Sequence, residues 1–174
     1  QRVMDIAASL RRLGLMPEQR IMMFMADCPE FVTVFLAALR IGAIPVPVST
    51  MMHTDGLVEL LRDSRARLLA ATSDFIQPAL EAAAEAPDLT ALLVVGEASP
   101  VDAPIPVLRL ADLPEGGGRG DGDAMYRCDE DFPAFWLYTS GTTGSPKAAM
   151  HRHGSIRVVC ETYGSQVLGI RPDD

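Results

Sequence analysis

Hydrophobic residues in the first 95 positions follow two alternating patterns, short continuous runs and longer stretches with helical spacing. The continuous runs have strand length and match strands buried on both faces of a sheet; they occupy residues 20–27, 43–50, 66–72 and 91–95. Helices are predicted over residues 2–13 and 74–86, from Pro29 to Gly42, and from Thr54 onward. This alternation predicts an α/β fold in which helices cross over between parallel strands of a layered sheet.

Proline and glycine residues mark where several of these elements begin and end. Pro29 follows Cys28 at a first helical position, where a missing N–H costs nothing, and Gly42 ends the same helix. Pro45 and Pro47 predict that the second strand lies at an edge of the sheet or soon leaves it, because proline cannot donate to a central ladder. The methionines of "RIMMFMAD" are interpreted as core packing rather than as a cofactor site.

Residues 96–133 break the pattern and are predicted to form an irregular connection rich in glycine and proline. Within it, "EGGGRGDGD" (115–123) is expected to be a flexible loop, and its Arg-Gly-Asp triplet is not interpreted as an adhesion motif. Five acidic side chains could suggest a metal site, but they lack the spacing of a calcium loop. A solvated surface is therefore favoured for Asp121, Asp123, Asp129, Glu130 and Asp131.

Composition narrows the class of protein. The 174 residues carry 15 Lys and Arg against 23 Asp and Glu, a formal net charge of −8, so no general attraction to nucleic acid or to an anionic membrane is expected. The scattered cysteines Cys28, Cys128 and Cys160 indicate reduced thiols in a cytoplasm rather than a disulfide framework. No apolar run reaches the roughly 20 residues that span a bilayer. The ends at Gln1 and Asp174 suggest part of a longer protein.

A predicted strand at 134–140 leads directly into "SGTTGSPK", a segment of hydroxyls, two glycines and a lysine. Glycines let backbone N–H groups approach an anion, hydroxyls add donors, and Lys147 adds positive charge, which together suit a phosphate group. The Walker pattern does not fit, because Pro146 precedes the lysine and Ala148 follows it. Since "KAAMHRH" reads as another strand, the segment is predicted to be a strand–loop–strand hairpin. Taken alone, it fits a phosphate loop and an ordinary Ser/Thr/Gly turn about equally.

The stretch "YTSGTTGSPK" resembles, almost letter for letter, the phosphate loop of the adenylate-forming superfamily, the AMP-binding enzymes that include acyl-CoA synthetases. A second block, "PEFVTVFLAALRIGAIPVPVST", is similar to the early α/β segment of that superfamily, so the resemblance extends over about residues 2–174 in collinear order. The strand "FWLY", the His-x-His after the loop and "VLGIRPDD" are most similar to benzoate-CoA ligases and related aryl-CoA ligases. Ala148 departs from the family, whose members usually place glycine there.

The resemblance implies a partial N-terminal AMP-binding domain without the C-terminal domain. Its parts would be an α/β segment (1–95), the irregular connection (96–133), and the phosphate-binding hairpin with the helix that follows it (134–174).

The same resemblance implies a reaction in which ATP activates a carboxylic acid, of aryl, benzoate-like type, to an acyl-adenylate, and coenzyme A then takes the acyl group. The residues that would cradle the β- and γ-phosphates with Mg²⁺ are Thr139, Ser140, Gly141, Thr142, Thr143 and Gly144. Lys147 would neutralise charge on the departing pyrophosphate. No catalytic residue or metal ligand is assignable, because relatives carry the ribose-binding aspartate, the Mg²⁺-binding acid and the adenylation lysine further downstream.

The partners implied are a small carboxylic acid, ATP and coenzyme A, with a homodimer left open. Two alternatives also stay open. One is a non-catalytic nucleotide-binding or interaction module, and the other is a different adenylate-forming enzyme, such as a fatty acyl-CoA synthetase or a peptide-synthesis adenylation domain. The 174 residues alone are expected to be inactive.

Aromatic and imidazole side chains surround the predicted loop. His151 and His153 are predicted to share one face of the second strand, where they could touch nucleotide or form a metal pair, but two ligands make a poor metal site and a structural role is favoured. Trp136 and Tyr138 are interpreted as core residues rather than substrate contacts. Tyr163 is expected to pack within the helix after the hairpin.

Overall fold

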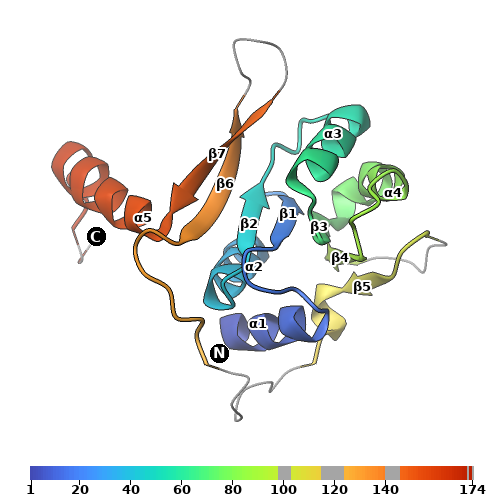
Figure 1. The fold of residues 1–174 in the computed structure, drawn as a ribbon, viewed down its shortest axis with the longest axis horizontal. Coiled ribbons are helices and arrows are strands. Elements are labelled where there is room, and N and C mark those ends of the chain that lie inside the picture. The colour runs from blue at the N-terminus through green and yellow to red at the C-terminus, as the bar shows by residue number, and fades with distance from the viewer. Residues whose placement is uncertain (98–102, 115–123, 140–145, 172, 174) are drawn as a thin grey trace.

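The computed structural model describes residues 1–97, 103–114, 124–139, 146–171 and 173. It contains a five-stranded sheet with helices on both faces and a separate two-stranded hairpin followed by a further helix (Figure 1). The strand order of the main sheet is β2-β1-β3-β4-β5, and every neighbouring pair in it is parallel. The predicted α/β fold with a layered parallel sheet is therefore confirmed.

The elements follow the sequence patterns closely. The strands of the main sheet are β1 (Arg20–Phe24), β2 (Ile44–Pro47), β3 (Leu68–Thr72), β4 (Ala91–Val95) and β5 (Val107–Arg109). The helices around it are α1 (Arg2–Arg12), α2 (Pro29–Arg40), α3 (Thr54–Ser64) and α4 (Ile76–Ala84), with short 3-10 turns η1 (Ser73–Phe75) and η2 (Leu110–Asp112). The hairpin consists of β6 (Pro133–Thr139) and β7 (Lys147–Arg152), and α5 (His153–Val159) continues into the π-helical segment η4 (Cys160–Val167).

The core lies in two layers, one on each face of the main sheet. Ile21 and Met23 of β1 pack with α1 and α2, whereas Met22 and Phe24 pack with α3 and α4. All four of these side chains are at most 1% exposed, which explains why β1 reads as a continuous apolar run without polar alternation. The methionines of β1 are thus core residues, as predicted.

Strand β2 lies at one edge of the main sheet, as its two prolines predict. Among the described strands it pairs only with β1, through a parallel register that places Ile44 opposite Arg20 and Val46 opposite Met22. The side of β2 away from β1 lies against β6 of the hairpin (Figure 1). The edge strand therefore connects the main sheet to the hairpin by packing.

The interpretation of residues 96–133 as wholly irregular is wrong in one respect. Val107–Arg109 forms β5, which extends the parallel sheet beside β4, with Val107 opposite Leu92. The strand has only three residues and follows Pro104 and Pro106, so neither its length nor its flanks distinguish it from a loop. The predicted glycine-rich loop 115–123, with its Arg-Gly-Asp triplet, lies outside the described residues.

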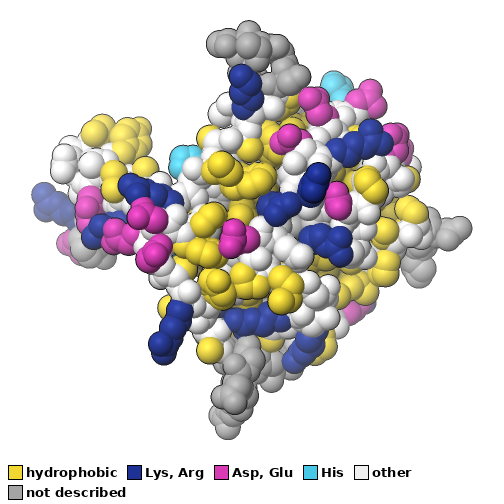
Figure 2. All heavy atoms as spheres, in the orientation of Figure 1, with side chains coloured by type: hydrophobic (Ala, Val, Ile, Leu, Met, Phe, Trp, Pro, Cys, Tyr) yellow, Lys and Arg dark blue, Asp and Glu magenta, His cyan; other side chains and the backbone are white. Residues whose placement is uncertain are grey.

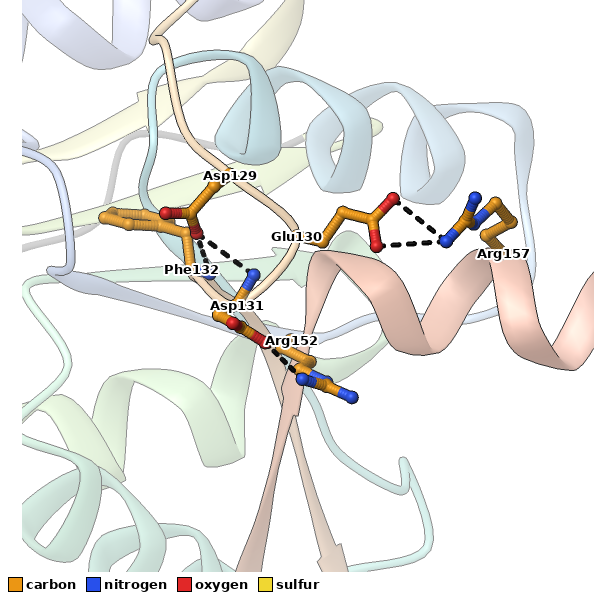
Figure 3. Close-up of polar contacts among 6 residues, drawn as sticks. All are labelled: Asp129, Glu130, Asp131, Phe132, Arg152 and Arg157. Carbon is orange, nitrogen blue, oxygen red and sulfur yellow. Dashed lines mark hydrogen bonds and ion pairs between the residues drawn. The ribbon is translucent and has the colours of Figure 1, made fainter.

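An acidic segment fixes the chain where it enters the hairpin (Figure 3). One carboxylate oxygen of Asp129 accepts hydrogen bonds from the backbone N–H groups of Asp131 and Phe132, both at 3.0 Å, in an Asx-type turn. Asp131 pairs with Arg152 of β7, and Glu130 pairs at 3.0 Å with Arg157 of α5. These exposed carboxylates serve as turn and surface ion-pair groups, which supports the predicted solvated surface; Asp121 and Asp123 lie outside the described residues.

Candidate phosphate-binding hairpin

The hairpin formed by β6 and β7 carries the predicted phosphate loop. The two strands are antiparallel, and the last pair in their register places Thr139 directly opposite Lys147. The segment from position 140 to position 146 therefore connects two paired strands and does not open a helix, which confirms the predicted strand–loop–strand arrangement. Of the predicted phosphate contacts, Thr139 and Lys147 are in the described structure. Ser140, Gly141, Thr142, Thr143 and Gly144 lie outside the described residues.

Lys147 is the only lysine in the sequence. Its side chain is exposed at the loop end of the hairpin, on the same face as that of Thr139, because directly opposite residues of an antiparallel pair point to one side. It takes part in no ion pair with any residue that the structure describes. The stem of the hairpin thus presents a hydroxyl and an ammonium group on one face, and both groups can donate hydrogen bonds to an anion.

The opposite face of β6 packs onto the main domain. Trp136 and Tyr138 are partly buried and pack against the core layer under α3 and α4, which supports their interpretation as packing residues. The guanidinium carbon of Arg20 lies 5.5 Å from the centre of the Trp136 ring, a cation–π contact. The Tyr138 hydroxyl donates a hydrogen bond to the carboxylate of Asp63 in the last turn of α3. Sequence reasoning missed Asp63 and Arg20, because no local pattern signals contacts between positions as far apart as Tyr138 and Asp63, which are separated by 75 residues.

The prediction that His151 and His153 share a strand face is wrong, because β7 ends at Arg152 and His153 begins α5. His151 stacks on Phe135, with ring centres 4.6 Å apart and planes within 7°. The His153 ring lies 6.3 Å from that of Phe132. Each imidazole therefore packs against a different aromatic ring, which supports a structural role. The residues that the structure describes contain no group of three or more metal-ligating side chains.

The burial of His153 predicts that the stability of the fold depends on pH. Burial lowers the pKa of His153 below its ordinary value, and among the described residues its Nε2 is buried without a hydrogen-bond partner. The unfolded chain therefore binds more protons than the folded chain as the pH falls below about 6.5, the ordinary pKa of histidine. We expect stability to decrease over that window and the decrease to be smaller in His153→Gln. Urea unfolding at pH 7.5 and pH 5.5 measures this, and His151→Gln is the matched control. Equal pH dependence in His153→Gln and wild type would contradict the assignment.

The helix after the hairpin differs from expectation in its packing. Tyr163 lies in η4 and is 54% exposed, so it does not pack against the described part of the chain as predicted. Several other large apolar side chains from 156 to 170 are also exposed: Ile156, Val158, Val159, Val167, Leu168 and Ile170. Figure 2 shows hydrophobic side chains at this end of the molecule beside Lys, Arg, Asp and Glu side chains, and further hydrophobic side chains over the centre of the same face. No helix in the described ranges is long and apolar enough to cross a membrane.

The three cysteines are all described and are free, in agreement with the predicted reduced thiols.

The whole chain, residues 1–174, matches the family of AMP-binding enzymes. The protein belongs to this family. The superfamily inferred from the loop sequence is thus confirmed over the full length of the chain.

Family members with high similarity to this chain are aryl-CoA ligases. The 4-hydroxybenzoate–CoA/benzoate–CoA ligase of Rhodopseudomonas palustris is 40% identical over 172 residues, which cover 99% of this chain and 30% of the relative. The benzoate–CoA ligase of Thauera aromatica is 32% identical over 174 residues, with 99% and 31% covered. The chain therefore spans about a third of the length of these relatives.

Solved structures of AMP-binding enzymes have the same fold. A benzoate CoA ligase from Burkholderia xenovorans superimposes with a TM-score of 0.79 at 28% identity, covering 97% of this chain and 31% of the other. An anthranilate CoA ligase in complex with anthranoyl-AMP gives a TM-score of 0.88 at 26% identity, covering 98% and 32%. The hairpin and the parallel sheet are thus shared with enzymes of this class.

Proposed function

We propose that the protein, in its complete form, is an ATP-dependent carboxylate–CoA ligase that acts on an aryl acid of the benzoate type. The observation that carries this proposal is the hairpin stem, in which Thr139 and an exposed Lys147 bracket a segment of hydroxyl and glycine residues. Benzoate-, hydroxybenzoate- and anthranilate-CoA ligases among the similar proteins support the aryl class of acid.

In the proposed reaction, a carboxylate oxygen attacks the α-phosphorus of ATP, and the bond from that phosphorus to the bridging oxygen of pyrophosphate breaks. Negative charge develops on the departing pyrophosphate. The ammonium of Lys147 stabilises that charge, while the Thr139 hydroxyl and the glycine-rich segment orient the β- and γ-phosphates. The thiolate of coenzyme A then displaces AMP from the acyl-adenylate. These roles are positioning and charge stabilisation, as in other displacements at phosphorus.

Mg²⁺ would supply further neutralisation of the phosphates when bound. The carboxylates near the hairpin, Glu130 and Asp131, are engaged with Arg157 and Arg152 (Figure 3). The described residues therefore do not provide a ligand set for this ion, and we assign no step to it.

The experiment that tests the proposal is ATP–pyrophosphate exchange by the product of the complete open reading frame. The panel of acids includes benzoate, 4-hydroxybenzoate, anthranilate, phenylacetate and a long-chain fatty acid. We expect the highest kcat/KM with a benzoate and a value at least tenfold lower with the fatty acid. A pocket shaped for an aromatic ring makes weaker contacts with an alkyl chain, and a loss of about 1.4 kcal/mol in transition-state binding lowers kcat/KM tenfold. The fatty acid as best substrate would contradict the aryl assignment, and no exchange with any acid would contradict ligase activity.

A non-catalytic nucleotide-binding module is the alternative, because the chain spans only about a third of its relatives. The length of the open reading frame distinguishes the two. Several hundred further residues that include an acidic ribose contact and a late lysine support the ligase.

A further inference from the structure

A polar contact between the hairpin and α3 has no role in the chemistry proposed above. The Tyr138 hydroxyl of β6 donates a hydrogen bond to Oδ2 of Asp63, which lies in the last turn of α3. Tyr138 is half-buried and Asp63 is exposed. An O–H group that donates to a carboxylate forms a stronger hydrogen bond than one between neutral groups. Two elements far apart in sequence are thus joined by a single directional contact.

The backbone at the end of α3, next to Asp63, is itself held by hydrogen bonds. Arg20, at the start of β1, donates through Nε to the carbonyl oxygen of Ser64 at 2.5 Å and through Nη2 to that of Arg65 at 3.4 Å. A cation at these unpaired carbonyl groups stabilises the helix C-terminus. The same guanidinium group lies over Trp136, two residues before Tyr138. Strand β6 therefore contacts α3 directly at Tyr138 and indirectly at Trp136, through Arg20 of β1.

The position of Tyr138 along the hairpin gives the contact its significance. Tyr138 pairs with Ala148, immediately before the last pair formed by Thr139 and Lys147. Because side chains alternate along a strand, Tyr138 points toward α3 while Thr139 and Lys147 point the opposite way. The contact thus fixes the backbone at the base of the loop and leaves the predicted phosphate contacts free.

We propose that Tyr138 and Asp63 are positioning residues, whose hydrogen bond holds the base of the phosphate-loop hairpin on α3 and so sets the orientation of Lys147 toward ATP. This inference rests on the proposed function. Burial and the bond to Asp63 raise the pKa of Tyr138 above its ordinary value, although the nearby Arg20 acts in the opposite direction. Tyr138 is therefore a protonated donor at neutral pH.

Tyr138→Phe removes the hydroxyl and keeps the ring against the core. We expect peptides from β6 and β7 to exchange backbone hydrogen faster in this variant, while β4, an interior strand of the main sheet, is unchanged. In ATP–pyrophosphate exchange by the complete protein, we expect the KM for ATP to rise about three- to tenfold, the range of one net hydrogen bond. The KM for the aryl acid should stay within twofold. A general loss of folding would change both KM values or the amount of active enzyme instead.

Two further variants define the contact. Asp63→Asn keeps an acceptor oxygen and should give a smaller rise in the KM for ATP than Asp63→Ala. Asp112→Asn is the matched control, because Asp112 also accepts a side-chain hydrogen bond at the end of a short helix, from Arg109 at 2.7 Å, next to β5 and away from the hairpin. It should change neither the hydrogen exchange of the hairpin nor the KM for ATP.

The possible results separate this inference from the function on which it rests. Faster hydrogen exchange in the hairpin of Tyr138→Phe, together with a raised KM for ATP, supports the positioning role. Unchanged hydrogen exchange in the hairpin overturns the positioning role, and so does faster hydrogen exchange with an unchanged KM for ATP. Neither result contradicts ligase activity. A wild-type protein that neither binds ATP nor exchanges pyrophosphate contradicts the proposed function, and the positioning role with it.

Discussion

Lys147→Ala is expected to lower the rate of ATP–pyrophosphate exchange about 100- to 1,000-fold in the complete protein, the usual cost of removing one group that stabilises charge in a transition state. Lys147 is exposed at the loop end of the hairpin and forms no ion pair with the described residues. Its removal should therefore leave the thermal midpoint of unfolding nearly unchanged. An unaltered exchange rate with saturating ATP and aryl acid would rule out the proposed role.

Arg152→Ala is the matched control, because it removes an exposed cation from the same strand at the end remote from the loop. This variant should retain most of the exchange activity.

Gly144→Val should also slow exchange, since a side chain at that position would interfere with the close approach of phosphate oxygens to backbone N–H groups. Wild-type rates in both Lys147→Ala and Gly144→Val would refute the phosphate-loop assignment.

The sequence offers an independent readout for the same residue. Because Lys147 is the only lysine, an amine-reactive reagent has one side-chain target in residues 1–174. We expect ATP to protect Lys147 from modification in the complete protein and adenosine to protect it far less, because the proposed contact is with the phosphates. Equal protection by ATP and adenosine would place the lysine away from the phosphate tail.

The main sheet could be predicted because its information is local. Runs such as Arg20–Phe24 and Ala91–Val95 are apolar at every buried position, and the intervening helices have apolar residues at regular spacing. Strand β5 could not be predicted, because three residues carry no period and their pairing with β4 is the only signal of their structure. The prolines of β2 were informative, since they exclude a central position in the sheet.

The candidate site was predictable in part. The residue types from Thr139 to Lys147 indicate anion binding, but composition alone did not separate a phosphate loop from a plain turn, and only the resemblance to the adenylate-forming superfamily favoured the phosphate loop. The contacts that hold the hairpin on the main domain could not be predicted from the sequence. The bond from Tyr138 to Asp63 depends on how β6 packs beside β2 and α3, which is a property of the assembled fold. The two-residue period of a strand predicted that His151 and His153 share one face, but α5 begins at His153, so the strand period does not apply there.

The connection that leads into the hairpin is held at Gly42, just after α2. Gly42 has a φ of +76°, and a Cβ added there would lie 2.6 Å from Cδ1 of Tyr126. The Tyr126 N–H donates to the carbonyl oxygen of Arg40 at 2.9 Å, and the Tyr126 ring lies 5.2 Å from that of Phe132, the residue before β6. A glycine is required here both by the backbone conformation and by the close approach of an aromatic ring.

Gly42→Ala is accordingly expected to lower the free energy of unfolding by about 2–4 kcal/mol, the sum of about 1 kcal/mol for a side chain in the left-handed region and about 1–3 kcal/mol for overpacking. Gly14→Ala isolates the first contribution, because Gly14 has a φ of +81° and open space within 4 Å of the added Cβ. That control should lose only about 1 kcal/mol. Urea denaturation of both variants measures the difference, and equal losses would mean that Tyr126 does not restrain this turn.

The contact with Tyr126 can be separated from backbone strain by a second substitution. Tyr126→Ala should destabilise the wild type, because it removes a ring that packs on Gly42 and lies beside Phe132. In the Gly42→Ala background the same change should cost less, since it also relieves the clash with the added Cβ. Additive losses would show that the backbone alone requires glycine at position 42. A non-additive result would show that the turn after α2 and the chain entering the phosphate hairpin are energetically coupled through this one ring.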